Sequence, residues 1–147
     1  MLEIARAKTY TCPVHFLVDD AYSLTSINNS NNWKFDGGLA NFWLSHVPRD
    51  RIVHFLHRFH SKLKNGSTVF VADNVYIPGV GGQLLKKKDD QENTYKLRRL
   101  KEGTEHLVLK NYFLKDELLQ IFGQQLNADI EEIHYGSCYW FLSCYTY

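Results

Sequence analysis

The sequence predicts an α/β fold built on a mostly parallel sheet that ends in an antiparallel hairpin. The first observation is the order of three segments: a strand-like run at 35–42, an amphipathic helix at 49–64 and a second apolar run at 69–72. Strand, helix and strand with short connections form a right-handed βαβ unit, which requires parallel strands. The second observation is a further helical pattern at 114–125, followed by two β-prone runs within 129–145.

The length and composition favour a single domain. The 147 residues are 44% hydrophobic, enough to bury one core, so we expect one domain over 1–147. The 17 Lys and Arg residues nearly balance the 16 Asp and Glu residues, and 14% of the chain is aromatic. These values exclude a disordered chain and a protein that binds nucleic acid through bulk charge. No apolar run approaches the roughly 20 residues that cross a bilayer, so we expect a cytoplasmic protein without membrane contact.

The cysteine and histidine patterns indicate no metal centre. Cys12, Cys138 and Cys144 are odd in number and form no C-x-x-C pair, so they predict buried thiols rather than disulfides or a zinc site. On the predicted helix at 49–64, histidines recur at every third position, a spacing that drifts around the helix, and no carboxylate joins them. These histidines are His54, His57 and His60.

The first part of the chain contains two short elements and a loop. Residues 2–8 show the pattern of one or two helical turns, which Pro13 ends. Residues 14–18 are apolar and β-prone, and two aspartates follow them, so we expect a strand there. The polar, turn-forming stretch 25–32 is expected to be a surface loop.

Local patterns support each part of the βαβ unit. The Gly37-Gly38 pair inside the strand 35–42 indicates that another backbone element packs closely against it. Gly66 follows the helix and suits the left-handed conformation that ends helices. The run 69–72 is apolar without alternation, as in a strand buried on both faces. The helix carries apolar residues at spacings of four, three and four: Ile52, Leu56, Phe59 and Leu63.

The second half combines an irregular segment, two hairpins and a helix. Residues 77–93 hold three glycines, a proline and a charge run, so we expect a surface excursion in which 86–90 is a solvated charged loop. The runs 94–100 and 105–110 flank a turn and predict a hairpin. A leucine or phenylalanine recurs at every fourth position of the helix at 114–125. The closing hairpin is expected to pair 129–135 with 139–145.

Candidate functional residues follow the three strands of the predicted sheet. In open α/β sheets ligands bind outside the carboxyl ends of the strands, here residues 19–22, 41–46 and 73–76. Aspartates in these sets are suited to accept hydrogen bonds from a ribose hydroxyl or an adenine amine, and aromatic side chains to cover a flat ring. The basic residues at 96, 98 and 99 form a modest patch suited to an anionic substrate.

Three motifs together resemble the second half of a class I S-adenosylmethionine (SAM)-dependent methyltransferase: VHFLVDDAYSL, FDGGLANFWLSHVP and LHRFHSKLKNGSTVFVADNVY. In that family a strand ending in DA precedes an FD strand with a following HVP, a helix and a strand ending in Asp. The helix at 114–125 and the closing hairpin resemble the family's last helix and antiparallel seventh strand. The later motifs LRRL-x-EG and VLKNYF resemble a group of small bacterial methyltransferases. The resemblance implies a Rossmann-like methyltransferase sheet.

The resemblance also implies roles for individual residues in transferring a methyl group from SAM to a small-molecule acceptor. Asp20 is expected to face the adenine of SAM, Ala21 to lie beside the ring, and Asn41 and Phe42 to line the methionine end. His46 is the candidate general base, although a histidine at this position also serves simply to order the loop. The positions expected on the substrate side are Trp43, Ser45, Tyr76 and Arg98.

The sequence departs from the family in two features. The glycine-rich loop after the family's first strand and the acidic residue after its second strand are absent, so the sheet is expected to lack its first two strands. Gly79, Gly81 and Gly82 do not replace the loop, because no helix follows to present backbone N–H groups. We therefore expect the chain to bind SAM weakly or not at all. A catalytically inactive remnant and a protein-interaction module remain alternatives, and a nicotinamide-binding fold is weaker because no dinucleotide loop is present.

The missing strands also predict an open sheet edge. Either residues 14–18 pair directly with 35–42, or a second copy of the chain covers the edge. We favour the homodimer, because the Gly37-Gly38 pair and the apolar run 14–18 leave an edge that invites pairing.

Overall fold

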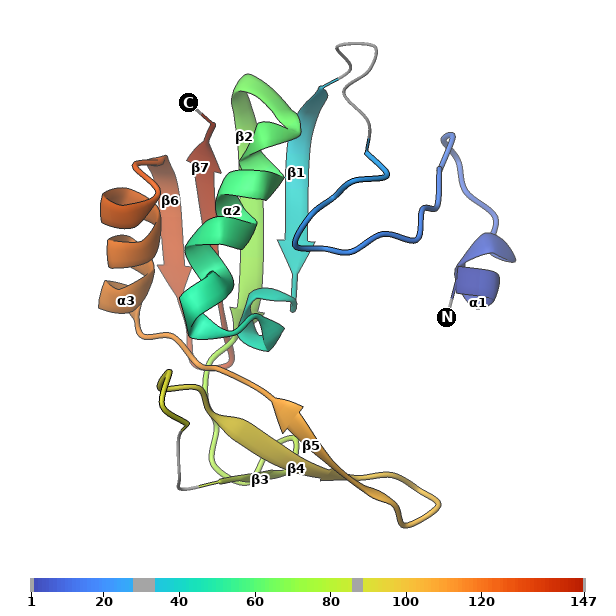
Figure 1. Ribbon diagram of the computed structural model, residues 1–147, viewed down its shortest axis with the longest axis vertical. Coiled ribbons are helices and arrows are strands. Elements are labelled where there is room, and N and C mark those ends of the chain that lie inside the picture. Colours follow the sequence, from blue (N-terminus) through green and yellow to red (C-terminus); the bar gives the residue numbers. More distant parts are fainter. Residues whose placement is uncertain (1, 28–33, 86–88, 147) are drawn as a thin grey trace.

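The computed structural model describes residues 2–27, 34–85 and 89–146, and its main sheet has the predicted α/β character (Figure 1). Four strands lie in the order β1-β2-β7-β6. β1 pairs with β2 in parallel, whereas β7 is antiparallel to both β2 and β6. Three strands therefore point in one direction and β7 opposes them. Their bounds are β1 (Phe35–Asn41), β2 (Leu63–Asn74), β6 (Asp129–Tyr135) and β7 (Tyr139–Tyr145).

The two predicted amphipathic helices are confirmed, with different internal geometry. Between β1 and β2 the chain forms two 3₁₀ turns, η1 (Leu44–His46) and η2 (Arg49–Arg51), and then α2 (Ile52–Ser61). The second helix starts as α3 (Lys115–Leu119) and continues as the π-helical segment η3 (Gln120–Gln125).

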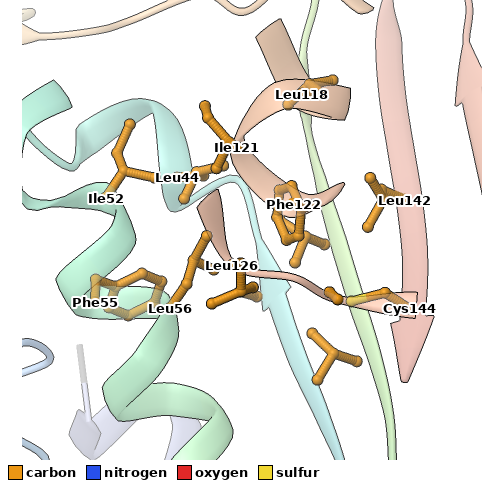
Figure 2. Close-up of a cluster of buried hydrophobic side chains, with 14 of the residues drawn as sticks. Leu44, Ile52, Phe55, Leu56, Leu118, Ile121, Phe122, Leu126, Leu142 and Cys144 are labelled. Carbon is orange, nitrogen blue, oxygen red and sulfur yellow. The ribbon is translucent and has the colours of Figure 1, made fainter. Parts of the chain in front are cut away.

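One core joins both helices to the sheet. Side chains of α2 pack beside those of α3 and η3 over the main sheet (Figure 2), and Leu56, Phe122 and Leu142 are completely buried. Gly38 shows why β1 needs a glycine, because a Cβ there lies only 2.8 Å from the Phe59 ring. The predicted close approach to this strand is present, but at Gly38 a side chain makes it rather than a backbone element. Gly66 has a positive φ of 76°, although it lies within β2 rather than at the helix end.

A smaller antiparallel sheet lies beyond the end of the main sheet at which β1 and β2 finish (Figure 1). It contains β3 (Gln83–Leu84), β4 (Tyr95–Arg99) and β5 (Glu105–Leu109), and the β4–β5 pair confirms the predicted hairpin. The backbone N–H of Asn111 donates to the Ser45 carbonyl at 2.8 Å, which ties this sheet to η1. The small sheet therefore lies next to the region where the sequence predicts ligands.

The predicted strand at 14–18 is wrong. This segment is irregular and exposed, with Leu17 58% and Val18 76% accessible, and it does not pair with β1. A β-prone run forms a strand only where a neighbour accepts its backbone hydrogen bonds. Just after the segment the Asp19 carboxylate accepts hydrogen bonds from its neighbour Asp20 and from Ser26, which folds the chain into a turn.

The remaining N-terminal predictions have mixed outcomes. The helical turns are confirmed as α1 (Leu2–Arg6), which has no buried residue and lies apart from the sheet (Figure 1). The prediction of three buried thiols is wrong, because Cys12 and Cys138 are exposed and only Cys144 is buried. Most of the predicted loop at 25–32 and the lysines at 86–88 lie outside the described residues.

No helix in the described part of the chain is long and apolar enough to span a lipid bilayer.

Candidate functional site

A shallow apolar cavity of about 300 Å³ lies beside the carboxyl half of β1. Three segments far apart in the sequence line it: Ala21 and Leu24 before β1, residues of β1 and its end such as Asn41 and Trp43, and the aromatic ring of Phe55 in α2. The walls are mainly apolar, and the Asn41 side chain adds a polar group. The cavity is therefore suited to a flat, largely apolar ring. We call it the β1 cavity.

Asp20, the residue predicted to face the adenine of SAM, stabilises the turn at 20–24. One oxygen of the exposed Asp20 carboxylate accepts a hydrogen bond from the Tyr22 backbone at 2.9 Å, and the Asp20 carbonyl accepts one from Leu24 at 2.8 Å. Tyr22 packs against the core, and the Arg51 guanidinium lies 5.4 Å from its ring. Ala21 is thereby held against β1 although no strand precedes it.

Phe42 ends β1 with a left-handed backbone and does not line the β1 cavity. Its φ is 53°, its N–H donates to the Ala72 carbonyl at 2.8 Å, and its side chain is 54% exposed. The predicted residues around this turn fall into two groups. Ala21, Asn41 and Trp43 lie on one side, and those after Trp43 turn toward the small sheet.

A buried polar cluster lies where η1, β2 and the strand β5 meet. The Lys110 ammonium donates to Ser45 Oγ at 2.6 Å, to Asp73 Oδ1 at 3.0 Å and to Asn74 Oδ1 at 3.2 Å. The Ser45 N–H donates to the other Asp73 oxygen at 2.9 Å. Lys110 is 3% exposed, and Ser45 and Asp73 are fully buried. Ser45, predicted to face substrate, is thus bonded inside the protein in this conformation.

His46 has a defined tautomer. Its Nδ1 lies 2.8 Å from the Leu109 carbonyl, and because a carbonyl only accepts, Nδ1 carries the proton and donates. Burial lowers the pKa of His46 below its usual value of 6.5, and the nearby Lys110 ammonium lowers it further. The ring is therefore neutral at pH 7, with the lone pair on Nε2. A neutral imidazole held in this way can accept a proton at Nε2.

The last two predicted residues lie near a second, smaller cavity, the β4 cavity, of about 110 Å³. Arg98 lines it together with Lys96 and Tyr112. The Tyr76 ring meets the Tyr112 ring edge to face at 5.2 Å. The structure therefore divides the predicted residues between two neighbouring regions rather than gathering them in one pocket.

Sequence reasoning missed the residue that organises this region. Lys110 lies in the motif VLKNYF, which the resemblance includes but to which the pattern assigns no role. The available signal was a lysine inside an apolar strand-like run, where a charge needs a buried partner. Its partner Asp73 appears in the sequence only as one of several aspartates that follow a strand.

Comparisons with known proteins reveal similarity in structure alone. No family model and no curated protein matches the sequence. The PH0226 protein from Pyrococcus horikoshii aligns with a TM-score of 0.70 and 15% identity over 99% of this chain and 67% of its own. A SAM-dependent methyltransferase from Methanosarcina mazei aligns with a TM-score of 0.65 and 17% identity, over 99% and 74% of the two chains. The complex of DhpI with SAM and HEP gives 0.61 and 17%, over 86% and 55%.

The chain is shorter than the proteins that it matches. The chain spans 48% and 55% of the length of DhpI in two complexes, and 63% of a SAM-dependent methyltransferase from Clostridium acetobutylicum. Within the chain, the alignments extend over 77% or more of the residues in each case. The sheet order, the parallel β1–β2 pair and the antiparallel β7 agree with these matches. This chain therefore has the fold of the class I SAM-dependent methyltransferases, as the sequence resemblance predicted.

Proposed function

We propose that this chain acts in SAM-dependent methyl transfer to a small-molecule acceptor, with the β1 cavity as its part of the donor site. The observation that carries the proposal is the meeting of Ala21 and Asn41 in one cavity. These residues come from separate motifs of the methyltransferase resemblance, which implies donor contacts for both. DhpI, a structural neighbour, forms complexes with SAM and with SAH.

The residues around the β1 cavity fit part of the donor. The apolar wall formed by Ala21, Leu24 and Leu39 suits an adenine ring, and the exposed Asp20 carboxylate nearby keeps acceptor capacity for an exocyclic amine. Asn41 and the neighbouring Phe42 are the proposed contacts for the methionine end. When bound, SAM supplies an electrophilic methyl group for a nucleophilic oxygen, nitrogen or carbon.

His46 is the proposed general base on the acceptor side. The hydrogen bond from Nδ1 to the Leu109 carbonyl holds the ring and directs the Nε2 lone pair away from that bond. Nε2 is then able to take the proton from an acceptor hydroxyl or amine, because the lowered pKa keeps the imidazole neutral. Trp43, Tyr76 and Arg98 are the proposed acceptor contacts. Ser45 holds Lys110 in place by accepting a hydrogen bond from its ammonium.

Titration of the chain with SAM tests the donor assignment. We expect weak binding, with a dissociation constant above the low micromolar range that corresponds to about −8 kcal/mol, because the glycine-rich loop is absent. Asp20→Ala and Asn41→Ala are expected to weaken it at least tenfold further, whereas His46→Ala leaves it unchanged. Isothermal titration calorimetry and NMR chemical-shift mapping at millimolar SAM measure these effects.

Two results contradict this assignment. If His46→Ala abolishes SAM binding while Asp20→Ala does not, the donor and acceptor regions are assigned the wrong way round. If millimolar SAM leaves the spectrum of the chain unchanged, the proposed donor site fails and an inactive remnant or an interaction module becomes the better description.

The open edge of β1 supports a second proposal, self-association of the chain. β1 pairs only with β2 among the described strands, and Phe35 on β1, which does not line the β1 cavity, is 52% exposed. Unpaired strand edges with apolar side chains recruit partners. We expect a dimer by size-exclusion chromatography with light scattering, and Phe35→Lys is expected to shift it toward monomer. Leu107→Lys is the control, because Leu107 is similarly exposed but lies on the small sheet. A stable monomer at high protein concentration contradicts this proposal.

A further inference from the structure

Three cationic side chains of the small sheet line the β4 cavity. Lys96 and Arg98 are two apart on β4, so they project from the same face of the strand. Lys110, just beyond β5, joins them at the wall. Asn74 at the end of β2 and Cys138 before β7 also line the cavity. The cavity thus lies between the small sheet and the carboxyl end of the main sheet.

The charges of this cavity are not balanced within the described structure. Lys110 has a buried carboxylate partner, Asp73. Lys96 is only 2% exposed; its ammonium donates to the Val80 carbonyl and lies 5.4 Å from the Tyr112 ring. No carboxylate of residues 2–27, 34–85 or 89–146 forms an ion pair with Lys96 or Arg98. A buried ammonium without a counter-charge destabilises a fold, so its presence at a cavity wall needs an explanation.

The available donors suit an anion of small size. An ammonium has three N–H donors. Lys96 uses one of them in the hydrogen bond to the Val80 carbonyl, so donors remain for a ligand. The Arg98 guanidinium adds planar donors that match carboxylate and phosphate geometry. The cavity has a volume of about 110 Å³, which leaves room for one oxyanion group between these donors.

We propose that the β4 cavity binds an oxyanion group, a phosphate or a carboxylate, carried by the acceptor molecule, with Lys96 and Arg98 as its ligands. The placement on the acceptor rests on the proposed function. His46 supports it, because the Leu109 carbonyl that holds His46 belongs to the residue preceding Lys110 in the cavity wall. An anchored oxyanion therefore brings the rest of the acceptor next to the candidate base.

Alkylation of two cysteines provides a test that needs neither SAM nor turnover. Cys138 lines the cavity and is exposed, and Cys12 is exposed in the N-terminal segment away from it. Inorganic phosphate is expected to slow modification of Cys138 by iodoacetamide at least fivefold, with Cys12 unchanged, as measured by peptide mass spectrometry. Sodium chloride at equal ionic strength is the control, and sodium acetate is the carboxylate arm. Protection by acetate alone assigns a carboxylate, and protection by neither anion at tens of millimolar overturns the proposal.

Matched variants separate anion binding from general charge. Lys96→Met and Arg98→Leu are expected to remove the protection by phosphate, whereas Arg99→Leu, on the opposite face of the same strand, retains it. Lys96→Met is also expected to raise the midpoint of thermal unfolding, because it removes an uncompensated buried charge. Arg98 is exposed, so its variant tests binding without risk to the core. Protection that survives both Lys96→Met and Arg98→Leu overturns the assignment.

The two proposals fail separately. If phosphate protects Cys138 but the chain does not bind SAM, the anion site stands and the methyltransferase proposal fails. If SAM binds and no anion protects Cys138, the donor site stands and the anion site is rejected.

Discussion

Replacing Lys110 with methionine is expected to destabilise the fold by about 3 to 5 kcal/mol, because Asp73 then keeps a negative charge in the interior without a partner. Asp73 is fully buried and Lys110 is 3% exposed, with 3.0 Å between the ammonium and the carboxylate. The loss also removes the donor to Ser45 Oγ. The free energy of unfolding in urea, followed by circular dichroism, measures the effect.

A double variant shows whether the unpaired Asp73 carboxylate causes the loss of stability. Asp73→Asn combined with Lys110→Met removes both charges, so we expect it to recover part of the stability lost in Lys110→Met alone. Lys101→Met, in the exposed turn between β4 and β5, is the control and is expected to change stability by less than about 0.5 kcal/mol. A loss below about 1 kcal/mol in Lys110→Met means that the pair contributes little and that water reaches Asp73.

The stability of the fold is expected to fall by about 3 kcal/mol between pH 7 and pH 4 because of His60 alone. Burial lowers the pKa of His60 from 6.5 to about 4, and the neighbouring His57 adds to the effect. The unfolded chain therefore takes up a proton at a higher pH than the folded chain. The contribution is complete above pH 6.5 and is lost as the pH falls from 6.5 toward 4. The stabilities of wild type and His60→Leu at several pH values measure it.

The difference between two variants isolates the His60 effect from other acid titrations. His60→Leu places an apolar side chain that does not titrate at a buried position of α2. The stability of this variant is therefore expected to fall less steeply over this pH range. His54→Gln changes an exposed histidine on the same helix and is expected to retain the wild-type slope. Equal slopes in wild type and His60→Leu contradict the assignment, because they mean that His60 titrates alike in both states.

Lys110 links the stability of the fold to the acceptor region. Lys110 joins the small sheet to the end of β2 through Asp73, and the same lysine lines the β4 cavity. Loss of that connection is therefore expected to disturb the acceptor region as well as the global stability. The hydrogen-bond partners of Lys110, which are Ser45, Asp73 and Asn74, do not line the β1 cavity. SAM binding to the folded fraction of Lys110→Met is accordingly expected to stay near the wild-type level.

The sequence alone determined the elements whose signal is local and periodic. The four-residue repeat of apolar side chains predicted both helices, and the runs at 129–135 and 139–145 match the bounds of β6 and β7. The Gly37-Gly38 pair predicted a close neighbour, which is the Phe59 ring. The motifs around Asp20 and Asn41 carry the family resemblance that predicted the methyltransferase fold. Their roles toward SAM, and those of His46 and the substrate-side residues, stay predictions.

Only the tertiary structure decided the features that depend on a partner distant in sequence. Residues 14–18 have the composition of a strand, but no strand within 2–27, 34–85 or 89–146 pairs with them, so the segment stays irregular. Lys110 pairs with Asp73 across 37 positions, and neither residue identifies the other in the sequence. The tautomer of His46 follows from a carbonyl 63 residues away. Composition and periodicity describe what a segment can form, whereas pairing, burial and charge balance arise when segments meet in space.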